Sequence, residues 1–139
     1  MKNIKSSVFK LRVDFLGILF LLLVSCKGSN EKIKIINPCN SNFSPKYIAL
    51  AFEDGFDKDS IIVMFNNSVI FDSIVSTDRR LGLAEIIYIT NNKNKSAIVI
   101  LKINGQRFEL KGICKQLVKL NYIQDTLIVE YLNHSKAYQ

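Results

Sequence analysis

The chain has 139 residues, a length at which a single domain is expected. Residues 1–25 contribute +3 to its net charge of +7, because they hold four of the 19 basic side chains and one of the 12 acidic ones, and the remainder has +4. A charge of that size, spread along the chain without a basic stripe, argues against a nucleic-acid partner.

The first 25 residues have the layout of a secretory signal peptide rather than of a folded element. A basic region comes first, with Lys2, Lys5, Lys10 and Arg12. An uninterrupted apolar run, FLGILFLLLV, follows at positions 15–24, and it is shorter than the roughly 20 residues that a membrane-spanning helix needs. We therefore expect residues 1–25 to be removed after export.

The apolar run ends at Leu23-Val24-Ser25-Cys26, which resembles the lipobox of bacterial lipoproteins. The resemblance implies a diacylglyceryl thioether on Cys26, cleavage before it, and acylation of the new amino group, with palmitate as a typical chain. Two or three acyl chains anchor a protein stably, whereas one is marginal. We therefore expect a protein held to a membrane from outside the cytoplasm. The alternative is an ordinary signal peptide that is cut elsewhere.

Two residues near Cys26 bear on the membrane that the protein reaches. Lys27 stands where an aspartate would indicate retention in the inner membrane, so the resemblance implies the outer membrane or another membrane of the cell envelope. Export to the cell surface in Bacteroidetes bacteria tends to need acidic residues just after the cysteine, and here Glu31 is the nearest, among lysines. The periplasmic face is therefore expected in preference to the cell surface.

Residues 26–46 contain both prolines with several asparagines and serines, which is typical of a tether, with partial order near 33–36 and Cys39. Once Cys26 is acylated, Cys39 and Cys114 remain, an even number in a compartment where disulfides persist. A bridge between them is one interpretation. Two buried thiols are the other, because the sequence does not supply the geometry that a disulfide needs.

From Tyr47 onward, short runs rich in Ile, Val, Phe and Tyr alternate with clusters of Asn, Gly and Asp, the pattern of strands and turns. The pattern predicts eight strands, at 47–53, 60–66, 69–76, 83–90, 97–103, 106–113, 117–123 and 126–132. The second is apolar on both faces, which indicates a central position. We therefore expect residues 47–139 to form an all-β domain, a small antiparallel β-sandwich of two sheets.

Three of the predicted connections are two-residue turns, at Asn66-Asn67, Asn104-Gly105 and Gln124-Asp125. Asn-Gly between two alternating runs is the strongest hairpin signal that a sequence carries. Two segments have a helical alternative: residues 76–87 begin with capping residues, and residues 114–122 are compatible with a short helix.

The acidic loop at 53–59 is the densest group of oxygen ligands, and Asp54, Asp57 and Asp59 are its candidates for Ca²⁺ or another ligand. Their spacing differs from the twelve-residue EF-hand pattern, and Lys58 lies among them. The preferred interpretation is a solvated turn in which Gly55 provides the bend and aspartates cap backbone amides. No resident cofactor or metal is expected.

Arg79 and Arg80, on another loop, are a candidate contact for a carboxylate, a phosphate or a sulfated sugar. An exposed arginine pair is also common without any ligand, and that is the preferred interpretation. The single histidine, His134, lies in a polar tail without an obvious nucleophile or orienting acid. We therefore expect no catalytic residues, and a hydrolase is only a minor alternative.

Three short segments are similar to the Asp-Ser/Thr-aliphatic O-glycosylation motif of Bacteroidetes bacteria: Asp59-Ser60-Ile61, Asp72-Ser73-Ile74 and Asp125-Thr126-Leu127. Through Asp57-x-Asp59-x-Ile61-x-Val63 and Leu81-Gly82-Leu83-Ala84, the domain also resembles small uncharacterised lipoproteins of that phylum, a likeness that implies no active residues. The tyrosines are expected to pack in the core or at its rim, at Tyr47, Tyr88, Tyr122 and Tyr131.

These observations predict a non-catalytic module that binds a protein or a glycan of the envelope through loops at one end of the sandwich. The alternative is a structural component that associates through a strand edge. A binding module predicts a concave or aromatic patch bordered by residues 54–59 or 78–80, and a structural component predicts a long unpaired edge strand with an apolar flank. An enzyme predicts a pocket of converging ionisable groups with shifted pKa values.

Overall fold

The computed structural model describes residues 32–40, 44–92 and 96–133. Cys26, His134 and the predicted signal peptide lie outside these residues. Within 76–87 the chain forms a single turn, in which the N–H groups of Leu81 and Gly82 donate to the carbonyl oxygen of Asp78, as the helical-turn alternative allows. The described part of the chain contains nine strands and no helix, so the helical alternative at 114–122 is wrong. It accordingly holds no helix of the length and apolar character that a membrane crossing requires.

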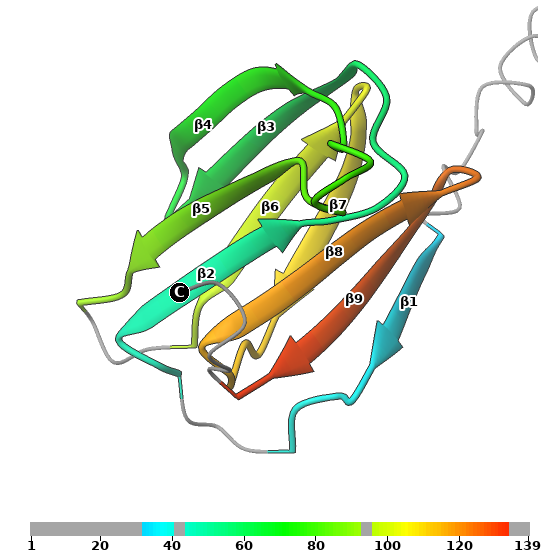
Figure 1. Ribbon diagram of the computed structural model, residues 1–139. Helices are drawn as coiled ribbons and strands as arrows, with labels where there is room; N and C mark the ends of the chain where they lie inside the picture. The colour runs from blue at the N-terminus through cyan, green and yellow to red at the C-terminus, as the bar shows by residue number, and fades with distance from the viewer. Residues whose placement is uncertain (1–31, 41–43, 93–95, 134–139) are drawn as a thin grey trace, which may run out of the picture. The chain divides into compact units, whose positions relative to one another are not determined.

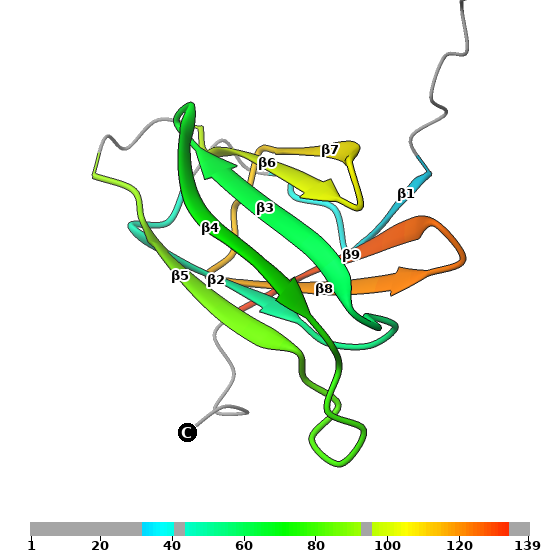
Figure 2. The ribbon, with the colours of Figure 1, turned by 90° about the horizontal axis from the view of Figure 1, so that it is seen from above.

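The strands form two sheets that pack face to face (Figures 1 and 2). The five-stranded sheet has the order β1-β9-β8-β2-β5, and the four-stranded sheet has the order β4-β3-β6-β7. Their bounds are β1 Ile33–Ile36, β2 Tyr47–Phe52, β3 Asp59–Phe65, β4 Ser68–Val75, β5 Glu85–Thr90, β6 Ile98–Ile103, β7 Gln106–Lys111, β8 Leu117–Ile123 and β9 Thr126–Leu132. The fold is therefore the two-sheet β-sandwich that the alternating sequence predicts.

One strand, β1, lies inside the segment predicted as a tether. It pairs in parallel with β9, with Ile35 opposite Val129, so ordered structure begins well before Tyr47. All four residues of β1 are exposed, and the strand is held to β9 by backbone pairing. The strand coincides with the partial order predicted near 33–36, and the domain boundary at 46 stays a prediction.

The core lies between the two sheets and is built by alternation. Strand β9 has a strictly alternating pattern, in which Leu127, Val129 and Tyr131 are buried and their neighbours are partly exposed. β3 lies between β4 and β6, as its apolar character predicts. The largest fully buried side chains include Phe52, Phe108, Leu50, Ile61, Leu101, Ile103 and Leu120.

Each of the three predicted two-residue turns closes a hairpin within one sheet, and both residues of each turn have positive φ. Every other connection between consecutive strands from β2 to β8 crosses from one sheet to the other. β4 and β5, which follow one another in the chain, consequently lie at edges of different sheets, as do β1 and β7. In Figure 2, β4 and β5 run along the same side of the sandwich.

The structure joins Cys39 and Cys114 by a disulfide, with their Cα atoms 5.7 Å apart. Cys39 follows β1, and Cys114 lies in the connection between β7 and β8. The backbone N–H of Cys114 also donates a hydrogen bond to the Cys39 sulfur at 3.0 Å. The bridge therefore fixes the segment after β1 to the body of the domain.

Candidate functional site

The acidic loop between β2 and β3 is held by backbone contacts to β8. The N–H of Asp54 donates to the side-chain oxygen of Asn121 at 2.9 Å, and the N–H of Tyr122 donates to the carbonyl oxygen of Asp54 at 3.0 Å. Gly55 has φ of 88°, the conformation that the predicted bend requires. The loop is thus a fixed turn at one end of the sandwich.

Asp59 turns its carboxylate toward protein donors. One oxygen accepts the backbone N–H of Asp57 at 2.8 Å, and the other accepts the side-chain amide of Asn104. Within the described ranges, no group of three or more His, Cys, Asp or Glu side chains is placed to hold a metal ion. The calcium hypothesis for Asp54, Asp57 and Asp59 thus gains no geometric support, and it stays a prediction.

The structure brings part of this loop together with part of the arginine loop. Asp54, Asp57 and Arg79 line one hollow of about 240 Å³, which we call the loop hollow. Its remaining walls are Gly55, Phe56, Ser76 and Thr77. Because two acidic residues and one basic residue line it, the composition of the loop hollow does not favour an anion.

Arg80 does not line the loop hollow. Its guanidinium lies 3.7 Å from a carboxylate oxygen of Asp78, and its backbone N–H donates to the same residue at 2.8 Å. The side chain of Arg80 is almost fully exposed, so this ion pair contributes little. The two arginines are therefore separated, and the structure does not combine them into one anion contact.

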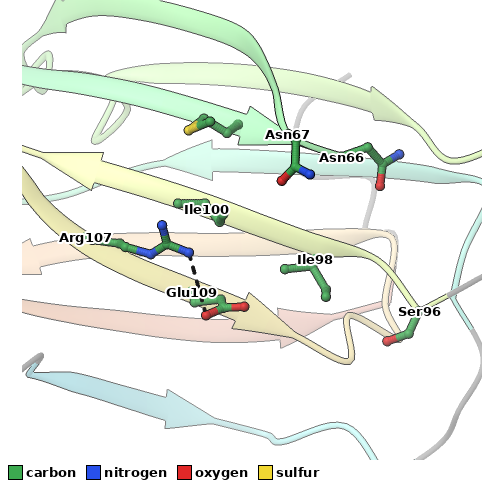
Figure 3. Close-up of a pocket in the computed structure, with 8 residues that line it drawn as sticks. Asn66, Asn67, Ser96, Ile98, Ile100, Arg107 and Glu109 are labelled. Carbon is green, nitrogen blue, oxygen red and sulfur yellow. Dashed lines mark ion pairs between the residues drawn. The ribbon is translucent and has the colours of Figure 1, made fainter.

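Another hollow lies on the outer face of the four-stranded sheet and has a volume of about 310 Å³ (Figure 3). Met64, Ile98 and Ile100 give it an apolar surface. Its polar residues are Asn66, Asn67, Ser96, Arg107 and Glu109, and the last two form an ion pair with 4.0 Å between their charged atoms. We call this site the sheet hollow.

The apolar surface continues from the sheet hollow to the edge of the sheet. Val69 on β4 pairs with Met64 on β3, and Met64 pairs with Ile100 on β6. β4 is an eight-residue edge strand with exposed Val69, Ile70 and Ile74, and a bulge interrupts its pairing with β3. An apolar row therefore reaches from the hollow to an unpaired edge.

A mainly apolar hollow, of about 190 Å³, lies on the five-stranded sheet. It is flanked by Tyr47 and Tyr88, which are 58% and 75% exposed, and we call it the tyrosine hollow. The prediction that these two tyrosines pack in the core or at its rim is therefore wrong, because both are exposed on the outer face of the sheet. Tyr122 and Tyr131 are buried as predicted. The distinction follows strand alternation, because Tyr47 and Tyr88 stand on the outward face.

Two side chains in the described structure have a clearly shifted pKa, and both belong to the core. Burial raises the pKa of Tyr131 above its ordinary value of 10.0. Burial, and next the charge of Asp125, raise the pKa of Tyr122. Neither tyrosine lines any of the three hollows described above. The shifts therefore report packing, and the prediction that the protein is not an enzyme stays a prediction.

Comparison with known proteins does not assign a family. No protein-family model matches the chain, and neither a curated protein nor a solved structure shows significant similarity to it. The functional argument consequently depends on the signal sequence and on the chemistry of the described surfaces.

Proposed function

We propose that the protein is an envelope lipoprotein anchored through Cys26, and that its β-sandwich is a non-catalytic module that binds a partner protein. The order of basic, apolar and Leu-Val-Ser-Cys segments supports the anchor. The disulfide between Cys39 and Cys114 supports an extracytoplasmic location, because structural disulfides are rare in the reducing cytosol.

The observation that carries the binding proposal is the group of apolar side chains, Met64, Ile98 and Ile100, on the outer face of the four-stranded sheet. The outward residues of a sandwich strand are normally polar, whereas β3 and β6 turn Met64, Ile98 and Ile100 outward. Around them lie Asn66, Arg107 and other polar side chains. An apolar centre within a polar rim is the usual anatomy of a protein–protein interface. The sheet hollow is therefore the proposed centre of the contact.

A structural component that associates through strand addition is the second candidate. The edge of β4 supports it, since no described strand pairs there and the backbone groups directed away from β3 are beside exposed Ile74 and Val69. The bulge beside Ile70 weighs against it, because natural edge strands use bulges to prevent pairing. Contact through the face of the sheet is accordingly the preferred mode.

The binding proposal is tested by two matched substitutions in the acylated protein. Ile98 is 43% exposed in the sheet hollow, and Ile123 is 47% exposed at the end of β8. A glutamate at position 98 would lose its hydration when the partner binds, which is costly for an unpaired carboxylate. Ile98→Glu is therefore expected to abolish recovery of the partner from cross-linked native envelopes. Ile123→Glu is expected to recover it as the wild type does. Equal recovery by both variants would contradict the proposed surface.

The anchor has a separate test. In Cys26→Ala, the thiol that carries the lipid is absent, so the protein is expected to move from the membrane pellet to the soluble fraction of disrupted cells. Intact mass of the wild-type protein should show a mature chain beginning at Cys26 with acyl groups. A variant that stays with membranes would show that lipidation is not the anchor.

A further inference from the structure

We propose that the tyrosine hollow is a second binding site, which takes a pyranose ring bearing a carboxylate, such as a hexuronic acid. The inference goes beyond the protein contact proposed above. It rests on that proposal only for the extracytoplasmic location, where acidic glycans are accessible. The site is on the opposite sheet from the sheet hollow, so the two contacts do not share residues.

The geometry comes from the pairing of β2 with β5. Tyr88 on β5 stands opposite Ala49 on β2, and Tyr47 precedes Ala49 by two residues on the same face. Leu117 on β8 is the other neighbour of Ala49. A small side chain is thus placed beside two large rings, and this difference in size forms the depression. A flat apolar group of a ligand fits between or against the two rings.

Core packing does not require aromatic residues at these positions, because both are on the outward face of the sheet. Both rings project outward, and neither phenol hydroxyl has a hydrogen bond to another described residue. Exposed aromatic rings offer large, rigid contact area with little entropy to lose on binding. The C–H face of a pyranose is apolar, so stacking on a tyrosine ring buries apolar surface on both partners while its hydroxyls stay at the edge.

Polar groups at the edge of the hollow define the charge of the ligand. Thr90 and Gln116 line it and offer hydrogen bonds to sugar hydroxyls. Lys46 does not line the hollow, but its ammonium lies 5.2 Å from the centre of the Tyr47 ring, and the described residues that do line the hollow include no carboxylate. A positive charge without a lining acid is complementary to a carboxylate on the sugar, which is why an acidic pyranose is preferred to a neutral one.

The assignment is tested by isothermal titration calorimetry, in which the mature protein is titrated with acidic tri-galacturonic acid and with neutral maltotriose. The acidic trisaccharide is expected to bind saturably and at least about tenfold more tightly than the neutral one. In Lys46→Gln this preference should fall to near unity, because the cation is lost while the rings remain. Equal affinity of the wild type for the two trisaccharides would overturn the acidic specificity.

Three further variants locate the site. Tyr88→Ala is expected to weaken binding of the acidic trisaccharide by about tenfold or more. Ala49→Leu is expected to do the same by filling the depression without removing a ring. Leu81→Ala is the matched control, because Leu81 is 75% exposed, as Tyr88 is, and does not line the hollow. All three positions are at the surface, and circular dichroism verifies that each variant is folded.

The outcomes separate this inference from the proposed function. No saturable binding of tri-galacturonic acid, or binding that Tyr88→Ala and Leu81→Ala alter equally, would overturn the saccharide site. Neither result affects the partner recovery measured with Ile98→Glu and Ile123→Glu. Conversely, a saccharide that binds through Tyr88 supports the inference even where Ile98→Glu recovers the partner normally.

Discussion

Gly55 lies directly against the main chain of Tyr122, so that a Cβ atom on Gly55 would overlap the carbonyl oxygen of Tyr122. The neighbouring residue, Asp54, exchanges hydrogen bonds with Asn121 and Tyr122 of the same strand. The acidic loop is therefore bound edge-on to β8, and glycine is required both for the positive φ of 88° and for the close approach.

Gly55→Ala is expected to lower the free energy of unfolding by more than about 2 kcal/mol, because backbone must move to relieve the overlap. Gly82→Ala is the matched control. Gly82 also has positive φ, at 63°, but an added Cβ there would meet no atom within 4 Å. Its expected cost is about 1 kcal/mol, from conformation alone. Denaturant unfolding measures both, and equal losses would contradict the packing argument.

The bend at Gly55 is predicted from the sequence, but its closeness to Tyr122 is not. A glycine among aspartates indicates a turn through local conformational preference alone. Contact with a residue 67 positions later depends on how the strands are ordered in the five-stranded sheet, and no local pattern encodes that order. The same reason explains why the sequence places Asp54 and Arg79 on separate loops, whereas the structure places them around one hollow.

Because of the disulfide, we expect reduction to lower the free energy of unfolding by a large amount. Cys39 and Cys114 are 75 residues apart, and on the chain-entropy account the bridge stabilises the fold by about 4 kcal/mol. Cys39→Ser combined with Cys114→Ser should lower the free energy of unfolding by about that amount. Addition of a reductant should produce a similar loss in the wild type and none in the double variant. A reductant-sensitive double variant would show that another effect operates.

The buried tyrosines predict loss of stability in alkali. In the unfolded chain their pKa is near the ordinary 10.0, and in the folded protein it is raised. Above pH 10 the unfolded state therefore binds fewer protons than the folded state, so the free energy of unfolding decreases as pH rises. The stability that depends on protonated Tyr122 and Tyr131 is therefore fully present below pH 10 and is lost as pH rises above it. Tyr131→Phe should reduce this alkaline slope, as measured by denaturant unfolding at successive pH values.

For Tyr131, we also expect a stabilising substitution near neutral pH. The hydroxyl of Tyr131 is buried and has no hydrogen-bond partner among the described residues, so Tyr131→Phe is expected to raise the free energy of unfolding by about 1 kcal/mol. Tyr122→Phe is the control, because the Tyr122 hydroxyl donates to Asp125 at 3.3 Å. Tyr122→Phe should be destabilising, and the same sign for both variants would contradict the assignment.

The β8–β9 hairpin contains an unfavourable turn residue. Gln124 has φ of 49°, a conformation in which asparagine is much better tolerated than glutamine. Gln124→Asn is expected to raise the free energy of unfolding by about 0.5 kcal/mol. Gln106→Asn, at the start of β7 and outside the set of positive-φ residues, should give no such gain. A gain of equal size in both variants would exclude the turn as its source.

One sequence pattern, the apolar run at 60–66, indicates both a central strand and the exposed apolar residues of the sheet hollow, but only the first of these is predicted from the sequence. Residues 60–66 are apolar on both faces, which correctly indicates a strand inside a sheet. In a two-layer sandwich, however, only one face of each sheet is covered, so the second apolar face of β3, which includes Met64, has to be at the surface. The neighbouring contributions from β6 and β4 depend on strand register, which is a property of the assembled sheet.

Site-specific photo-cross-linking in living cells tests the central claim most directly. A photoreactive amino acid replaces Ile98, beside Met64 and Ile100 in the sheet hollow, and in a parallel strain it replaces Ile123. The account predicts a discrete, membrane-associated protein adduct from position 98 and none from position 123. Adducts of the same mass and yield from both positions, or no protein adduct from position 98, would contradict it.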